Sequence, residues 1–253
     1  MEREEKYVKR DIAVCIALLI LAVGYFVYPQ IQSQRFNMRA QDTIYQFEAR
    51  VEAYRAEHYK RLAQAENNPA SPAYTPFWLE YVELWLSAIN HQLFIQNQIN
   101  LVDPFSYNHP PFNLHNMGFD TNIIGVINIP KIELRLPIYL GTSPQHLNNG
   151  VAHLTHSSFP IGGENTNAVI AGASSLYHGR LFRDIEQLEI GDEIHITNFM
   201  QTIVYVVIET RVTESYQIDA LAIQSGRDLV TLITTYTHRR GDRRYVVVAE
   251  RSC

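Results

Sequence analysis

The sequence predicts a mostly β protein, a barrel or sandwich of short strands that follows a helical region and an apolar N-terminal segment. Three observations lead to this prediction. Eight short runs rich in β-branched and aromatic residues, separated by turn residues, occupy the second half of the chain. Two stretches with apolar residues at spacings of three and four precede them. An uncharged apolar run of 17 residues lies near the N-terminus.

The apolar run, Ile12 to Tyr28, is at the short limit of what crosses a bilayer as a helix. Lysine and arginine residues precede it, which favours a cytoplasmic N-terminus. A cleaved signal peptide begins in the same way, but the run leaves through Tyr28-Pro29-Gln30 and not through a small-x-small cleavage site. A buried core helix is the other interpretation, and the polar flanks oppose it. We therefore expect residues 1–29 to form a cytoplasmic N-terminus and a transmembrane anchor, with residues 30–253 outside the cytoplasm.

Composition indicates that a packed core holds the external part together. Hydrophobic residues make up 46% of the chain and charged residues 19%. Of the two cysteines, Cys15 falls in the anchor and Cys253 is the last residue, so no disulfide can form within the external part. The net charge of -5 gives no electrostatic footprint for nucleic acid, and we expect no such partner.

Two stretches before the β-rich region carry a helical pattern. The first, residues 30–65, has an apolar stripe formed by Phe36, Ala40, Ile44, Phe47, Val51 and Tyr54. A connection rich in asparagine and proline follows at 67–76. The second stripe consists of Trp78, Val82, Trp85, Ile89 and Leu93. Both stripes predict helices that pack on each other or on a sheet.

The pattern changes after Leu101. The segment from Asp103 to Leu114 contains three prolines and no helical or strand period, so we expect a loop that completes a stem of residues 30–118. Residues 119–253 then form the β domain. Its expected strands are 123–129, 136–140, 150–154, 167–173, 193–199, 202–212, 229–235 and 244–250, with one helical interruption from Gly179 to Leu188.

Three segments of this β domain resemble consecutive sequence blocks of the sortases. They are GVINIPKIELRLPIYLGTS (125–143), GVAHLTHSSFPIGGENTNAVIAG (150–172) and LFRDIEQLEIGDEI (181–194). Sortases are Gram-positive cysteine transpeptidases that join proteins to the cell wall or to each other. The resemblance covers most of residues 119–251 and implies an eight-stranded sortase-type β-barrel.

The region ahead of the barrel resembles class C, the pilus-polymerising sortases. Two helices are followed by Asp103-Pro104-Phe105 just before the first barrel strand. In class C an Asp-Pro-aromatic lid folds over the active site, so the resemblance implies that Asp103, Pro104 and Phe105 form such a lid. If the lid has a regulatory origin, Asp103 should reach Arg244 as a charge-assisted pair.

The resemblance also assigns the positions where sortases keep their catalytic residues. Sortases attack a Leu-Pro-x-Thr-Gly-type (LPxTG) signal with a cysteine thiolate, helped by a histidine and an arginine. Here Thr235 stands at the cysteine position, Ala173 at the histidine position and Arg244 at the arginine position. An arginine is neither a nucleophile nor a base, and a threonine hydroxyl needs a base that Ala173 cannot supply.

We therefore expect a catalytically defective class C-like sortase homologue in the membrane of a Gram-positive cell. It would bind pilin or a sorting-signal peptide, assist an active sortase, and need no cofactor. We also expect no metal, because His153 and His156 point to opposite faces of a strand.

Two other interpretations stay open. His178 or His238 would restore an active transpeptidase or hydrolase if its loop brought the imidazole to Thr235. Alternatively, the barrel is a structural membrane-proximal module whose groove the lid closes permanently.

Overall fold

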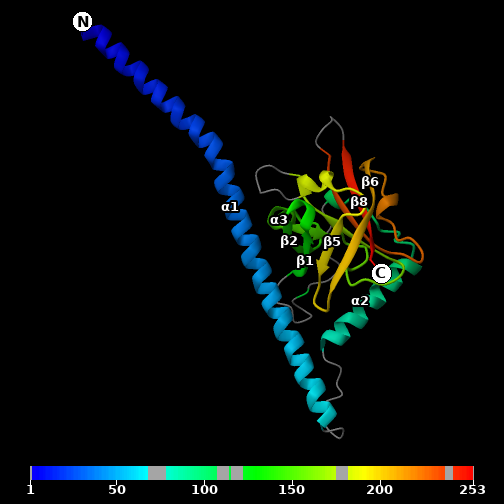
Figure 1. The fold of residues 1–253 in the computed structure, drawn as a ribbon. Helices are drawn as coiled ribbons and strands as arrows, with labels where there is room; N and C mark the ends of the chain where they lie inside the picture. Colours follow the sequence, from blue (N-terminus) through cyan, green and yellow to red (C-terminus); the bar gives the residue numbers. More distant parts are fainter. Residues whose placement is uncertain are drawn as a thin grey trace.

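Eight strands close into a barrel in the order β1-β2-β3-β4-β7-β8-β6-β5 (Figure 1). This computed structural model describes residues 2–67, 78–106, 114, 122–174, 182–236 and 242–252. The strands are β1 (Ile123–Ile129), β2 (Leu134–Leu140), β3 (Val151–His153), β4 (Thr166–Ala171), β5 (Glu193–Thr197), β6 (Thr202–Glu214), β7 (Asp228–Thr235) and β8 (Arg243–Arg251). The predicted mostly β fold with eight strands is confirmed, and the barrel is favoured over the sandwich.

The strand order brings the ends of three strands together. β4 and β7 are parallel neighbours, so both finish at the same end of the barrel. β8 pairs antiparallel with β7 and therefore begins at that end. In this ladder Thr235, the last residue of β7, is the partner of Arg244.

The side chains of β4, β7 and β8 divide into two apolar layers, because successive residues of a strand point to opposite faces. Residues from all eight strands share the inner core. A second group, here called the outer cluster, contains Leu101, Leu147, Ala152, Leu154, Val169, Ala171, Ala220, Leu221, Leu229, Ile233, Val246 and Val248. Its strand members alternate with inner-core residues, so the outer cluster is an apolar face on the outside of the barrel that loops cover.

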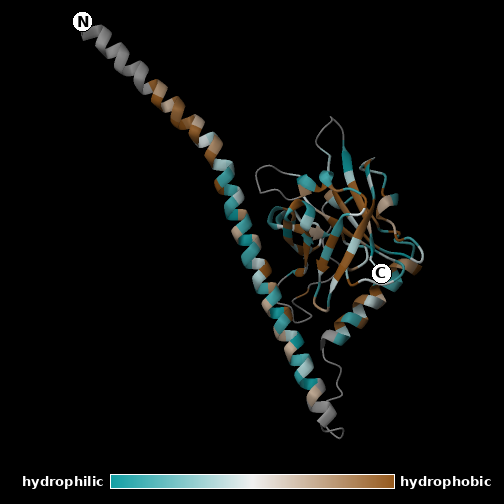
Figure 2. Cartoon of the chain, viewed as in Figure 1, coloured by the Kyte–Doolittle hydropathy of each residue, from teal (hydrophilic) through white to brown (hydrophobic). Residues whose placement is uncertain are grey.

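One helix, α1 (Glu2–Asn67), contains both the apolar N-terminal run and the first helical stripe. The helix continues through Pro29, although proline lacks the N–H of a helical hydrogen bond and usually kinks or ends a helix. Figure 1 shows α1 as one long, bent rod beside the barrel. Figure 2 shows an apolar segment in its N-terminal part, clear of the barrel. In the described part of the chain, α1 is the one helix long and apolar enough to cross a membrane.

The predicted stripe of α1 packs on the barrel. Ala40, Ile44, Phe47 and Val51 are buried in the inner core, and the rings of Phe47 and Phe199 lie 5.2 Å apart between centroids. Polar contacts flank this stripe. Glu48 forms an ion pair with Arg135 of β2, and Nη2 of Arg55 donates to the carbonyl of Met200 over 2.9 Å. The second half of α1 is therefore fixed to the barrel by both apolar and polar contacts.

The second predicted helix is α2 (Trp78–Ile95), which packs through Val82 and Leu86. Asn90 ties this helix to the loop after β3, because its Oδ1 accepts from the Phe159 N–H over 2.7 Å and its Nδ2 donates to the Phe159 carbonyl over 3.2 Å. The expected position of Trp85 on the packed face is wrong, since Trp85 is 38% exposed and Leu86 takes that place.

Short helices connect the strands. They are η1 (Pro104–Ser106), η3 (Pro130–Ile132), α3 (Pro144–Asn149), η4 (Phe182–Gln187) and η5 (Asp219–Leu221). The helical segment expected at 179–188 is a 3-10 helix where the structure describes it. In α3, Oγ of Ser143 accepts from the His146 N–H over 3.1 Å, which caps the helix. His153 is buried against the Phe159 ring and bonds the Ser158 carbonyl, as suits a structural residue.

Candidate functional site

The three positions singled out from the sequence meet at the end of the barrel where β4 and β7 finish. Hydrogen bonds continue the pairing beyond Ala171, because the Gly172 N–H donates to the Ile233 carbonyl over 3.1 Å. Oγ1 of Thr234 also donates to the Gly172 carbonyl over 2.7 Å. These bonds hold residues 172–174 beside the end of β7. Ala173 therefore lies near Thr235, which is itself the ladder partner of Arg244.

The hydroxyl of Thr235 pairs with another hydroxyl. Oγ1 of Thr235 and Oγ of Ser174 lie 2.6 Å apart, and either atom can be the donor. The sequence analysis did not assign Ser174 to the site, and its place directly after Ala173 is the signal that could have found it. A neutral hydroxyl has no useful basicity at neutral pH, so this pair is not a nucleophile with its base.

Arg244 is the most enclosed charged group of the site, with only 5% of its surface exposed. Its Nε donates to Oδ1 of Asp103 over 3.0 Å and its Nη2 to Oδ2 over 2.8 Å. Its Nη1 donates to Oδ1 of Asp242 over 2.7 Å. The guanidinium carbon lies 4.9 Å from the centre of the Phe105 ring, within cation–π range. The charge-assisted pair expected between Asp103 and Arg244 is therefore present.

Two carboxylates set the electrostatics of this cation. Burial alone lowers the pKa of Arg244, but hydrogen bonds and negative charge from Asp103 and then Asp242 raise it above its ordinary value. The pKa of the Asp242 carboxyl is lowered, first by the Ser215 hydroxyl that donates to it over 2.7 Å and then by Arg244. Arg244 and Asp242 are both charged at neutral pH.

The segment from Gln98 to Ser106 lies across the outer cluster. Leu101 belongs to that cluster, Phe105 packs against it, and Pro104 is buried. The side chain of Gln98 joins two loops at the start of this segment. Its Oε1 accepts from the Ile223 N–H over 2.6 Å, and its Nε2 donates to the His156 carbonyl over 3.4 Å. The residues expected to form a lid therefore cover the outer face of the barrel beside Arg244.

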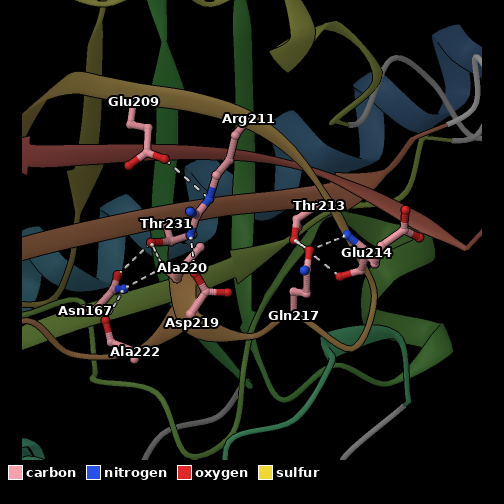
Figure 3. A network of polar contacts seen from close by, with 10 residues as sticks. All are labelled: Asn167, Glu209, Arg211, Thr213, Glu214, Gln217, Asp219, Ala220, Ala222 and Thr231. Atoms are coloured by element: carbon pink, nitrogen blue, oxygen red, sulfur yellow. Dashed lines mark hydrogen bonds and ion pairs between the residues drawn. The ribbon is translucent and has the colours of Figure 1, made fainter.

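The loop between β6 and β7 packs on the outer face of β4 and β7 and is fixed by polar contacts (Figure 3). The buried Asn167 of β4 donates through Nδ2 to the carbonyls of Ala220 and Ala222, over 3.3 and 3.1 Å. Thr231 of β7 donates to Oδ1 of Asn167 over 2.9 Å. Arg211 of β6 adds an ion pair with Asp219 at 3.2 Å. These bonds hold η5 against the outer face of β4 and β7.

Some predicted residues lie outside the described part of the chain. They include His178 and His238, the two histidines that were considered as bases for Thr235, and Cys253. Among the residues that are described, no group of three or more histidine, cysteine, aspartate or glutamate side chains is placed to hold a metal ion.

Residue 172, next to Ala173, must be a glycine because Phe182 fills the space that any side chain would occupy. A Cβ there would lie 2.4 Å from Cγ of the fully buried Phe182. Gly172→Ala is expected to lower the free energy of unfolding by about 1–3 kcal/mol, because a packed ring must move. Urea unfolding followed by circular dichroism measures this loss. If the clash is the cause, the double variant Gly172→Ala/Phe182→Leu loses less free energy of unfolding than the sum of the losses in the two single variants. Strictly additive losses would contradict this explanation.

Comparison with known proteins agrees with this geometry. The Sortase domain family model matches residues 127–252. Sortase D of Bacillus subtilis (strain 168) is 27% identical over 130 residues, which cover 50% of this chain and 63% of that protein. Sortase A of Bacillus anthracis is 27% identical over 168 residues, or 65% of this chain and 78% of that protein. The chain thus spans less than two thirds of the length of sortase D.

Similar solved structures are pilus-related. The Group B Streptococcus Pilus Island 1 sortase C2 has a TM-score of 0.63 and 30% identity, covering 70% of this chain and 98% of that one. Sortase C-1 of Streptococcus pneumoniae has a TM-score of 0.64 and 28% identity, covering 77% of this chain and 98% of that one. With the barrel topology and the family model, these matches show that the chain belongs to the sortase family, with pilus-related class C sortases as structural neighbours.

Proposed function

We propose that this chain is a membrane-anchored, class C-like sortase homologue that binds pilin or a sorting-signal peptide without cleaving it. In this role it assists an active sortase in assembling proteins on the outer surface of a Gram-positive cell. Residues 1–29 serve as its cytoplasmic N-terminus and anchor, residues 30–118 as its stem and lid, and residues 119–253 as the peptide-binding barrel.

The observation that carries the proposal is the chemistry at the end of β7. Thr235 occupies the position of the sortase cysteine, and its hydroxyl bonds the neutral hydroxyl of Ser174 over 2.6 Å. Ala173 occupies the position of the histidine. Arg244, which matches the sortase arginine, is engaged by the lid carboxylate of Asp103. Among the residues that the structure describes, the site has the arginine but neither a thiolate nor a base, so these residues have the means to hold a peptide and lack the means to cleave it.

The surroundings of the site suit an extended peptide. The outer faces of β4, β7 and β8 form an apolar floor under residues 98–106. Leaving that floor uncovered would expose apolar surface, so displacement of the lid favours a ligand that covers it again. Several of the similar solved structures, all from Group B Streptococcus, are named as pilus sortases, which supports pilin as the source of the peptide.

The proposal is tested by measuring binding and cleavage together. The full chain in detergent micelles, as wild type and as Asp103→Asn, is mixed with fluorescent peptides of the LPxTG type. We expect saturable binding and no product in either form. Cleavage that disappears in Thr235→Val would instead make this a threonine-dependent enzyme. If neither wild type nor Asp103→Asn binds a peptide, the remaining interpretation is that the barrel is a structural membrane-proximal module.

A further inference from the structure

The contacts of Arg244 indicate what kind of group its site accepts. Both oxygens of the Asp103 carboxylate face the guanidinium, on Nε at 3.0 Å and on Nη2 at 2.8 Å. The remaining edge is taken by Asp242 at 2.7 Å and by the Arg243 carbonyl at 3.2 Å. The paired geometry on Nε and Nη2 is the bidentate contact that guanidinium groups make with carboxylates. In the closed form, Asp103 thus occupies a carboxylate site.

Asp103 and Asp242 reach Arg244 from different parts of the chain. Asp242 is two residues away in the same hairpin, whereas Asp103 is 141 residues away in the lid segment. When the lid leaves, Nε and Nη2 lose both acceptors, while Nη1 keeps Asp242. The 5% exposure of Arg244 holds with the lid in place, and displacement of the lid opens Nε and Nη2 to the group that replaces Asp103. A charged acceptor restores the two charge-assisted hydrogen bonds, which are stronger than bonds to neutral oxygens.

The acceptor that replaces Asp103 must offer two oxygens in one plane and a negative charge. The carbonyl of an internal peptide bond offers a single neutral oxygen, so it brings no charge and cannot place a separate oxygen on each of the two donors. A carboxylate offers both. In an enzyme that cleaves its substrate, this arginine also stabilises negative charge that develops during the reaction. Where no reaction occurs, the negative charge that pairs with the guanidinium must come from the bound ligand.

The neighbouring hydroxyls fit the same ligand. Thr235 is the ladder partner of Arg244, so the two side chains extend from adjacent strands on one face, with Cβ atoms about 5 Å apart. The Thr235 and Ser174 hydroxyls lie 2.6 Å apart, so one of them can turn its proton to a nearby anion while keeping its partner. Arginine and hydroxyl donors together form a site for an anion with two oxygens.

We propose that Arg244, Thr235 and Ser174 form a binding site for the free carboxylate of a peptide C-terminus, which Asp103 occupies when the lid is closed. The ligand is an extended peptide that ends at the threonine of a sorting signal, rather than the uncut signal. This inference rests on the proposed peptide-binding function and specifies its ligand. Asp103 competes with the ligand as a tethered carboxylate at an effective concentration of about millimolar.

The test compares three peptides that differ only at their C-terminal end. Each carries the same fluorophore and the same Leu-Pro-x-Thr sequence, ending in a free carboxylate, in a carboxamide, or in an extension past the threonine. Fluorescence anisotropy with the full chain in detergent micelles gives the dissociation constants. We expect the Asp103→Asn variant to prefer the carboxylate peptide over the other two by about tenfold or more. We expect wild type to bind the carboxylate peptide about tenfold more weakly than Asp103→Asn does.

The matched control is Asp103→Asn/Arg244→Gln, in which the ion pair is replaced by two neutral amides. It should bind all three peptides with similar dissociation constants, because the cation that pairs with the carboxylate is absent. Equal binding of the carboxylate and carboxamide peptides by Asp103→Asn, or a preference that survives Arg244→Gln, would overturn this inference alone. If Asp103→Asn binds none of the three peptides, the peptide-binding function fails together with it.

Discussion

Thr235→Cys combined with Ala173→His is expected to turn the chain into a peptide-cleaving enzyme. In an opened-lid background with Asp103→Asn, cleavage of a sorting-signal peptide should rise about 10³-fold or more above the unaltered chain. The double change places a thiol at residue 235, the end of β7, and an imidazole at the neighbouring residue 173. Arg244 is already the ladder partner of residue 235. An imidazolium and a guanidinium next to the thiol favour the thiolate, which is the nucleophilic form.

The single variants are the controls for this reversion. Thr235→Cys alone lacks the base and Ala173→His alone lacks the nucleophile, so each should stay close to the unaltered chain. Residues that act as a unit give effects that are far from additive, and this pattern distinguishes a restored pair from a general change in the site. Iodoacetamide provides a second measurement, because the introduced thiol should be alkylated faster at pH 6 in the double variant than in Thr235→Cys alone. A double variant with a fast-reacting thiol and no cleavage would contradict our assignment of the site.

Ile44→Asp is expected to have the largest effect on stability. Ile44 has no exposed surface and lies in the middle of the stripe that docks α1 on the barrel. A carboxylate there is buried without a partner, and we expect a loss of about 4 kcal/mol or more in the free energy of unfolding. Urea unfolding of the full chain in detergent measures it. Limited proteolysis should then cut α1 after residue 30 sooner than it cuts the barrel.

Tyr45→Asp is the matched control, because Tyr45 is the next residue on α1 and is 73% exposed. The same negative charge enters the same turn of the helix, but on its solvent side. This variant should unfold within about 0.5 kcal/mol of the unaltered chain. Equal stability of the two variants would mean that α1 does not depend on its buried stripe.

Much of the fold follows from local pattern. Short runs rich in β-branched and aromatic residues, bounded by turn residues, place all eight strands, and the spacing of Ala40, Ile44, Phe47 and Val51 identifies the buried face of α1. The same kind of reasoning puts Trp85 on the packed face of α2, where Leu86 lies instead. Both side chains are apolar and adjacent in sequence, so only the docking of the helix on the barrel distinguishes them. Pro29 marks a usual helix boundary, yet α1 continues through it.

The site was less predictable than the fold. The pair between Asp103 and Arg244 was expected because opposite charges stood at two positions that the sortase resemblance brings together. The bond between Ser174 and Thr235 joins residues 61 positions apart, and it depends on the parallel pairing of β4 with β7. No local pattern reveals which distant strand becomes a parallel neighbour. The cover that Leu101 and Phe105 give to the outer cluster is likewise a product of long-range packing.

The unbroken course of α1 has a consequence for the geometry of assembly. With the apolar run in a bilayer, the docking stripe begins at Ala40, twelve residues after Tyr28, or about 18 Å further along the helix. A flexible tether would let the barrel search many heights and directions. A continuous helix instead fixes both the height of the barrel above the bilayer and its rotation about the helix axis. Each residue added between Tyr28 and Ala40 would turn the barrel by about 100° and move it about 1.5 Å further away. In this arrangement the stem sets the direction in which the site faces relative to the bilayer.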